Sequence, residues 1–167
     1  MTAPFRMDGL APGHGRDGFS RRVVALDHSL SHPASQDVRR RVSACCVAVQ
    51  VISGKVAGCD TLAAGGVPLI ALPAALVRRL PRYPSVPVAR VGRLAVETAV
   101  QGQKLGGALL ADAAMRAQRS DVAVFARVVD AKHDAAEAFC RHRGFELFAG
   151  LARRLIVPLT RFMSQGQ

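Results

Sequence analysis

The stretch GRLAVETAVQGQKLGGALL, residues 92–110, decides the fold of this chain. It completes an apolar run over residues 88–96, passes through a glycine-containing turn over 101–107, and then places Leu105 and Leu109 at helical spacing. We therefore predict a strand, a short loop and a helix of about 15 residues. Unsatisfied N–H groups and the positive dipole end at such a helix start bind anions, although an ordinary strand-turn-helix junction would show the same pattern.

The rest of the chain alternates strand and helix patterns, which favours a mixed α/β domain. A turn at Ser53, Gly54 and Lys55 separates apolar runs over 42–52 and 56–63, as in a hairpin. We also predict a helix over 19–35 that Pro33 ends, and a helix over 72–80. A capping box at Asp134 and Glu137 predicts the start of another helix, which Gly144 ends. Further strands are predicted over 122–129, 145–148 and 154–159. We predict a flexible leader over residues 1–18, one domain over 19–160 and a tail over 161–167.

The composition indicates a basic domain that binds polyanions. Among 167 residues, 23 are Lys or Arg, 20 of them Arg, against 12 Asp and Glu, so the formal net charge is +11. Such a surface favours phosphates and nucleic acid and repels polyamines and aminoglycosides. The length suits a single hydrophobic core.

The four cysteines predict a reducing, cytoplasmic location and no metal site. They form no C-x-x-C pair, and no histidine stands at zinc-finger spacing from them. Residues 1–18 lack the apolar core of a signal peptide. The uncharged run over 61–77 is short and interrupted by glycine and proline, so we expect no membrane span.

Residues 94–110 resemble the acetyl-CoA-binding segment of the GNAT acetyltransferases, whose loop reads Gln/Arg-x-x-Gly-x-Gly/Ala. Here the loop reads QGQKLG from Gln101 to Gly106. The similarity is closest to the GNAT toxins of type II toxin–antitoxin modules. Their other motifs resemble, in the same order, VAGCDTL at 56–62, LP and RLPRYP within 72–84, GRLAV at 92–96 and AFCRHRGF at 138–145.

The resemblance implies an α/β (α+β) GNAT fold, in which a mixed twisted sheet splays open at an acetyl-CoA cleft and helices flank the sheet. It implies an enzyme that transfers acetyl from acetyl-CoA to the α-amine of aminoacyl-tRNA and so blocks translation. A backbone N–H would polarise the acetyl carbonyl. The implied cofactor-binding residues are Leu94, Ala95 and Val96 along the pantetheine, and Gln101, Gly102, Gln103, Lys104, Leu105, Gly106 and Gly107 around the pyrophosphate.

A run of arginines without acids agrees with a nucleic-acid substrate. No Asp or Glu occurs between Thr61 and Val96, a stretch that contains five arginines. Phosphate neutralisation by such residues supplies much of the affinity for tRNA. A solvated basic face or a surface for an acidic protein would have the same composition. The candidate tRNA contacts are Arg78, Arg79, Arg82, Arg90 and Arg93.

Three site positions depart from the family pattern. Lys104 replaces the middle glycine of the loop, where a backbone φ above zero would strain a lysine, unless Lys104 simply begins the helix. Cys140 replaces the tyrosine that is thought to protonate the departing CoA thiolate, and a buried inert thiol is the alternative. His133 replaces an asparagine near the CoA thiol, where it keeps one hydrogen bond to the cofactor or is an ordinary surface residue. In addition, Cys59 and Asp60 replace two aromatic residues of the acceptor pocket.

These departures leave other functions open. One is a catalytically weakened GNAT protein that acts as a binding or regulatory partner of a ribbon-helix-helix antitoxin, whose tail would suit the arginine-rich face. Another is an N-acetyltransferase of a protein N-terminus or a small amine. Family resemblance also implies a homodimer.

Overall fold

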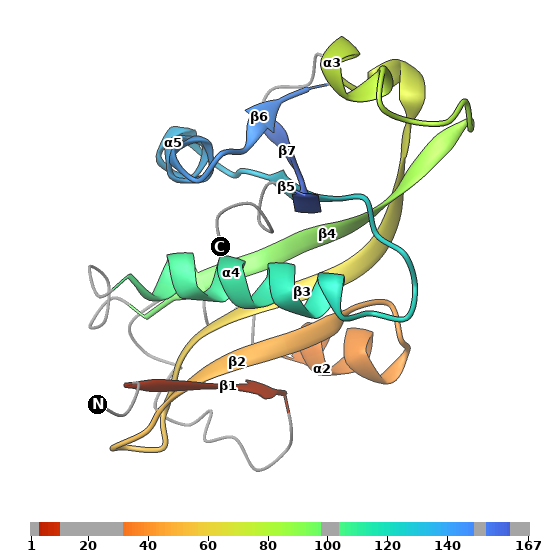
Figure 1. The fold of residues 1–167 in the computed structure, drawn as a ribbon. Coiled ribbons are helices and arrows are strands. Elements are labelled where there is room, and N and C mark those ends of the chain that lie inside the picture. The colour runs from red at the N-terminus through yellow and green to blue at the C-terminus, as the bar shows by residue number, and fades with distance from the viewer. Residues whose placement is uncertain (1–3, 11–31, 98–103, 149–152, 161–167) are drawn as a thin grey trace. The chain divides into compact units, whose positions relative to one another are not determined.

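The computed structural model describes residues 4–10, 32–97, 104–148 and 153–160 (Figure 1). In chain order the elements are β1 (Phe5–Gly9), α2 (His32–Arg39), β2 (Ala44–Gln50), β3 (Val56–Pro68), the 3-10 helix η1 (Leu69–Ala71), α3 (Ala74–Val77), β4 (Ser85–Val96), α4 (Leu105–Gln118), β5 (Ala126–Asp130), α5 (Asp134–His142), β6 (Glu146–Leu147) and β7 (Arg154–Pro158). The strands are ordered β1-β2-β3-β4-β5-β7-β6. The chain divides into two compact units, one of residues 1–63 and 92–113 and one of residues 64–91 and 114–167.

The first unit is built on an antiparallel ladder of β1, β2 and the beginning of β3. Successive strand residues point to opposite faces. On one face Val47 and Val49 of β2 pack with Val38 of α2, and on the other Ala48 packs with Leu105 and Leu109 of α4. The first turns of α4 therefore cover the face of this ladder that α2 leaves free.

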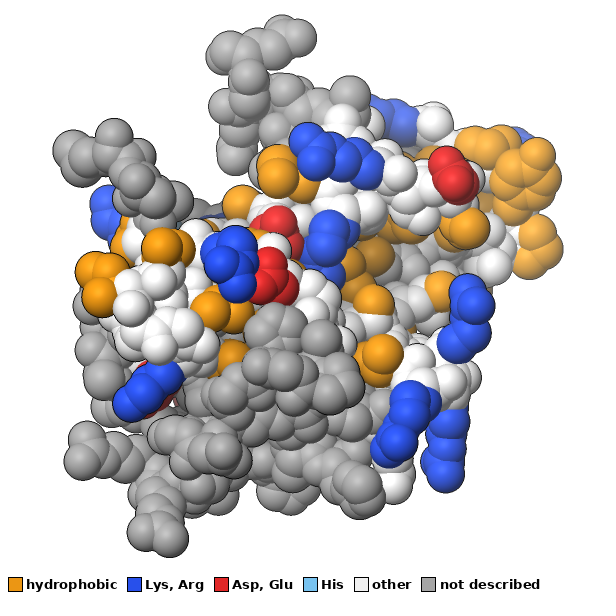
Figure 2. Space-filling view, turned by 90° about the horizontal axis from the view of Figure 1, so that it is seen from below, with side chains coloured by type: hydrophobic (Ala, Val, Ile, Leu, Met, Phe, Trp, Pro, Cys, Tyr) orange, Lys and Arg blue, Asp and Glu red, His pale blue; other side chains and the backbone are white. Residues whose placement is uncertain are grey.

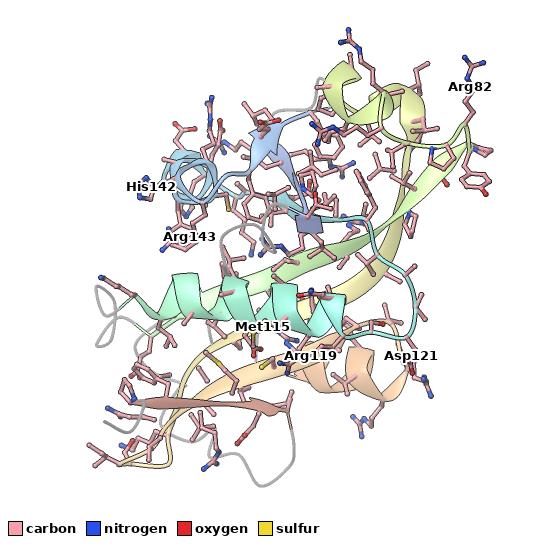
Figure 3. The ribbon with its side chains drawn as sticks, in the orientation of Figure 1. Arg82, Met115, Arg119, Asp121, His142 and Arg143 are labelled. Atoms are coloured by element: carbon pink, nitrogen blue, oxygen red, sulfur yellow. The ribbon has the colours of Figure 1, made fainter. Side chains whose placement is uncertain are left out.

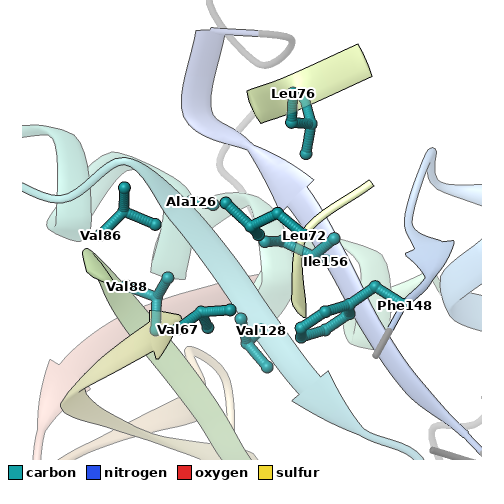
Figure 4. Close-up of a cluster of buried hydrophobic side chains, with 9 residues drawn as sticks. All are labelled: Val67, Leu72, Leu76, Val86, Val88, Ala126, Val128, Phe148 and Ile156. Carbon is teal, nitrogen blue, oxygen red and sulfur yellow. The ribbon is translucent and has the colours of Figure 1, made fainter. Parts of the chain in front are cut away.

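The second unit contains the parallel pair β4 and β5, from Val88 opposite Ala126 to Val91 opposite Val129. Strand β7 pairs antiparallel with β5, and β6 with β7. Its core, drawn in Figure 4, joins these strands to the connection between β3 and β4 and consists of Val67, Leu72, Leu76, Val86, Val88, Ala126, Val128, Phe148 and Ile156. None of the described helices has the length and apolar character needed to cross a membrane.

The structure confirms the mixed α/β prediction and most of its elements. The hairpin of β2 and β3, helix α4 and the final strand pair occupy the predicted residues within a few positions. Gly144 has a φ of +90° just after α5, as a helix-ending glycine requires.

The prediction of a flexible leader over residues 1–18 is wrong for its first part, because Phe5–Gly9 forms the edge strand β1. Phe5 and Met7 alternate with Arg6 and Asp8 and pack against the cluster that holds Leu105 and Leu109. This apolar alternation is short, and the surrounding glycines, proline and charges conceal it. Residues 11–18 and the predicted tail over 161–167 lie outside the described residues.

Two helix boundaries differ from the prediction. Residues 19–31 of the helix predicted over 19–35 lie outside the described residues, but Pro33, which was expected to end it, lies in the first turn of α2 (His32–Arg39); proline fits a first turn because its missing N–H has no intrahelical partner. Helix α5 is capped by His133 rather than Asp134, and the Asp134 carboxylate instead pairs with Arg153 at 2.7 Å.

Candidate functional site

The last residues of β4 contain a backbone kink. Arg93 has a φ of +48° inside the strand, in the left-handed region that costs a non-glycine residue about 1–2 kcal/mol. Beyond it, Leu94 and Val96 pack toward α4, whereas Ala95 packs on the face that holds Val38. All three predicted pantetheine residues are half-buried, so part of this strand segment stays accessible.

Contacts within the first unit hold this kink. The Arg93 guanidinium pairs with Asp37 of α2 at 3.0 Å, and the Cys59 thiol donates to the Arg93 carbonyl at 3.6 Å. Burial raises the pKa of the Cys59 thiol, so it keeps the proton that it donates. Gly92 lies tightly on Thr61, whose Oγ1 would be 3.0 Å from an added Cβ. The strain at Arg93 is therefore fixed by packing, a hydrogen bond and an ion pair.

Helix α4 begins at a second left-handed residue. Lys104 has a φ of +62° and is exposed, and its carbonyl accepts a hydrogen bond from the Ala108 N–H at 3.1 Å. The structure thus places lysine where glycine would be unstrained. Leu105 is buried, while Gly106 and Gly107 are half-buried in the first turn. Gln101, Gly102 and Gln103 of the predicted pyrophosphate loop lie outside the described residues.

Gly58 of β3 sets how closely α4 approaches the ladder. A Cβ at Gly58 would lie 3.0 Å from the Ala95 carbonyl oxygen and 3.1 and 3.2 Å from the side chains of Leu109 and Leu105. Only glycine leaves this space without a shift of backbone or helix. The helix start and the strand segment of the candidate site are thus packed against the same residue.

Cys140 lies in α5 of the second unit and is only 2% exposed. Burial raises the pKa of its thiol, and the nearby Arg143 and Arg127 oppose that rise. The thiol is therefore protonated at neutral pH, but its burial keeps it from solvent. Burial also lowers the pKa of Arg127 to about 10, which leaves it charged at neutral pH beside the Phe145 ring, 5.1 Å from its centroid.

His133 caps helix α5. Its Nδ1 accepts the Ala136 N–H at 3.1 Å, which places the proton of the neutral ring on Nε2. The exposed ring therefore has an N–H donor to offer, while its acceptor nitrogen is used in the cap. Among the described residues, no group of three His, Cys, Asp or Glu side chains is arranged to hold a metal ion.

The five candidate tRNA-binding arginines do not form one group. Arg90 pairs with Asp130 at 3.0 Å, and Arg93 pairs with Asp37. The other three, Arg78, Arg79 and Arg82, are exposed, and within the described ranges no ion pair engages them. In Figure 2 basic side chains, coloured blue, outnumber the acidic ones, coloured red, in the view drawn. The structure therefore leaves the three arginines between β3 and β4 as the ones available to a polyanion.

Sequence reasoning missed the acidic partners of the site. Asp37 precedes a run of three arginines at 39–41, and Asp130 is the last residue of the apolar strand β5. Asp130 accepts hydrogen bonds from Arg154 at 2.7 Å and from Arg90, which lower its pKa. Neither pairing has a local signal, because each joins residues far apart in the sequence.

A family model described as the acetyltransferase (GNAT) family matches residues 36–145. The chain belongs to the GNAT acetyltransferase family. It is thus an acetyltransferase, and acetyl-CoA, the acetyl donor of that family, is its cofactor, as predicted. The described residues at the end of β4 and at the start of α4 fit such a donor, because they offer half-buried strand residues, a helix start and the cation of Lys104.

This GNAT chain is 37% identical to a tRNA-acetylating toxin of Mycobacterium tuberculosis over 131 residues, which cover 77% of this chain and 76% of that protein. The predicted resemblance to the GNAT toxins is thereby confirmed. Its fold is similar to that of AtaT complexed with acetyl-methionyl-tRNAfMet, with a TM-score of 0.85 at 21% identity over 98% of this chain and 99% of the other. It is also similar to a tyrosine-to-phenylalanine AtaT mutant bound to the C-terminus of the antitoxin AtaR and acetyl-CoA, with a TM-score of 0.78 at 19% identity and 99% coverage of both chains. These likenesses confirm the GNAT fold.

Proposed function

We propose that this GNAT enzyme is a toxin that acetylates the α-amine of aminoacyl-tRNA and so blocks translation. The observation that carries the proposal is the set of exposed arginines that form no ion pair with a described residue, on a GNAT domain whose stretch from Thr61 to Val96 contains no acid. Such a surface attracts a phosphate-rich substrate. The tRNA-acetylating relative, which matches three-quarters of the chain, supports the same substrate class.

The donor-binding residues would act mainly through their backbone. Leu94, Ala95 and Val96 would pair with the pantetheine, and an N–H of this segment would polarise the acetyl carbonyl. Lys104 and the N–H groups of Leu105, Gly106 and Gly107 would hold the pyrophosphate. Acetyl-CoA supplies a thioester carbonyl: the neutral amine forms the new N–C bond, the C–S bond breaks, the nitrogen loses a proton and the departing thiolate gains one.

Proton delivery is the step that this chain must perform without the family tyrosine. The Cys140 thiol holds a proton at neutral pH, but it is buried. Cys140, or a water molecule beside it, would have to deliver the proton to the departing thiolate. His133, whose Nε2–H is exposed, would donate one hydrogen bond to the cofactor.

A second candidate function is a GNAT scaffold with little activity that binds an antitoxin. The burial of Cys140 favours it, because a buried thiol would weaken proton delivery while the scaffold is retained. The AtaT structure with the antitoxin AtaR supports a protein partner for this fold. We propose a ribbon-helix-helix antitoxin, a homodimer and a cytoplasmic location under either function.

The experiment that separates these functions is transfer of labelled acetyl from acetyl-CoA to a pool of charged tRNAs. The matched control is the same pool after deacylation, which keeps every phosphate and removes the amine. Labelling of charged tRNA alone is the expected result. Equal labelling of both pools would place the acetyl group elsewhere on the RNA, and labelling of neither would favour the antitoxin-binding scaffold.

A further inference from the structure

The connection between β3 and β4 carries the chain's only tyrosine. Tyr83 stands among Arg78, Arg79 and Arg82, and the chain has no tryptophan. Tyr83 is 64% exposed, and Arg82 projects from the same segment in Figure 3. We name residues 69–84 the β3–β4 tip.

The tip is anchored to the core of the second unit. Leu72 and Leu76 are buried in that core. The Leu69 N–H donates to the Pro84 carbonyl at 3.1 Å, and the Tyr83 N–H donates to the Pro81 carbonyl at 2.8 Å. The backbone that carries Tyr83 is therefore held in place, and little ordering would be needed for its ring to bind a ligand.

A second large apolar side chain is exposed on the tip. Ile70 is 96% exposed. The hydrogen bond between Leu69 and Pro84 closes the tip, and Ile70 and Tyr83 are the chain neighbours of these two residues inside it. One exposed apolar residue is ordinary, but an aromatic and an aliphatic residue at the two ends of one closed connection offer apolar area to a ligand.

The charges around the tip select a polyanion. The stretch from Thr61 to Val96 has no acid, and within the described part of the second unit Asp130 and Asp134 are paired with Arg154 and Arg153. Double-stranded RNA presents phosphates but keeps its bases stacked inside the helix, where an aromatic ring cannot reach them. Unpaired nucleotides present both phosphates and flat base faces, which stack on aromatic side chains.

We infer that the β3–β4 tip binds unpaired nucleotides of RNA, with one base stacked on Tyr83 and neighbouring phosphates bound by Arg78, Arg79 and Arg82. The inference rests on the proposed function and deepens it, because it names the part of the RNA substrate that this chain contacts. Ile70 would add apolar contact to the ribose or base edge beside the stacked ring.

Tyrosine fluorescence tests the contact directly, since the chain's single tyrosine is Tyr83 and tryptophan is absent. We would titrate the full chain, without acetyl-CoA, with a short single-stranded oligouridylate and with the same RNA annealed to its complement. Free N-acetyltyrosinamide corrects for light absorbed by the RNA. Quenching by the single strand alone is expected; equal effects of single strand and duplex, or no quenching, would overturn the inference.

Substitutions separate stacking from charge. Tyr83→Ala should weaken single-strand binding about fivefold or more and leave its salt dependence unchanged, while Tyr83→Phe keeps the affinity. Arg82→Gln should instead reduce the slope of log Kd against log salt by about 0.7, as loss of one phosphate contact predicts. Arg119→Gln, an exposed arginine at the end of α4 (Figure 3), is the charge-matched control and should change neither. Unchanged binding by Tyr83→Ala would contradict stacking.

The β3–β4 tip would instead be an interface between two copies of the chain if its apolar residues hold the copies together. In sedimentation, Ile70→Ala and Tyr83→Ala would then lower the molecular mass without changing the Kd for RNA, whereas Ile52→Ala, at an isoleucine 95% exposed in the β2–β3 turn, would not. That result overturns the inference. If Tyr83→Ala has the wild-type KM for charged tRNA, the inference is overturned but the proposed function stands. If single-stranded RNA binds as expected but no acetyl group is transferred to charged tRNA, only the proposed function is overturned.

Discussion

The proposed donor-binding residues at the end of β4 and the start of α4 differ from Cys140 in how they would act. In the first set, Lys104 replaces the family glycine and still takes up the left-handed backbone open to a glycine, and Arg93 is left-handed too. In the second, one substitution removes the tyrosine hydroxyl, and no backbone group can replace a side-chain acid. Under the proposed function, donor binding through main-chain groups would tolerate changes of residue type, whereas proton delivery by a side chain would not.

Cys140→Tyr should have the largest effect and would show that this one residue limits proton delivery. A restored acid contributes about 10²–10⁴ in rate. The added ring must fit at a buried position, so stability should fall by about 1–3 kcal/mol. Transfer rates at saturating acetyl-CoA and a urea denaturation curve measure the two effects. Cys140→Ser is the control, since it is too short to act as the tyrosine does, and a matching gain in Cys140→Ser would contradict the account.

Gly58→Ala should damage the donor-binding residues most. The added Cβ would meet the Ala95 carbonyl oxygen at 3.0 Å, so α4 or the strand must move, at a cost of about 1–3 kcal/mol in stability. Acetyl-CoA binding, followed by calorimetry, should weaken with it. Gly66→Ala on the same strand is the matched control, because its Cβ would find only ordinary contacts at 3.7 and 3.9 Å. Equal effects of the two variants would break the comparison.

Arg93 distinguishes backbone from side chain within one residue. Arg93→Ala keeps the strain of a positive φ and loses the Asp37 ion pair, whereas Arg93→Gly loses the pair but removes the strain. We expect a few-fold weaker acetyl-CoA binding for Arg93→Ala and near wild-type binding for Arg93→Gly, in line with the modest strength of part-exposed ion pairs. If Arg93→Gly binds as poorly as Arg93→Ala, the guanidinium itself contributes to the site.

Lys104→Gly should give the smallest effect and the opposite sign. Glycine relieves the left-handed strain before α4, for a gain of up to about 1 kcal/mol in stability, while the lost cation removes one attraction for pyrophosphate. Thermal unfolding without ligand isolates the first effect, and acetyl-CoA titrations at two salt concentrations isolate the second. A lower melting temperature without ligand would contradict the assigned backbone strain.

The sequence predicted those parts of this molecule that local pattern determines. The hairpin could be predicted from the turn at Ser53 and Gly54, and helix α4 from its leucine spacing. The family glycine at the position of Lys104 indicated a positive φ, which the structure has there. The pairs of Arg93 with Asp37 and Arg90 with Asp130 were not predictable, because only the chain topology brings them together. Strand β1 was missed because its pairing with β2, rather than its own propensity, makes it a strand.

The most direct test of a donor site held by backbone is the melting temperature of the wild type and of Cys140→Tyr with and without saturating acetyl-CoA. A ligand at 100 times its Kd stabilises by about 2.7 kcal/mol, which for a chain of this length raises the melting temperature by about 5 °C or more. We predict the same rise for both proteins, because Cys140 is not in the segment that holds the donor. No rise in the wild type would contradict the assignment of acetyl-CoA to residues 93–107, and a rise only in Cys140→Tyr would show that donor binding depends on the residue at position 140 after all.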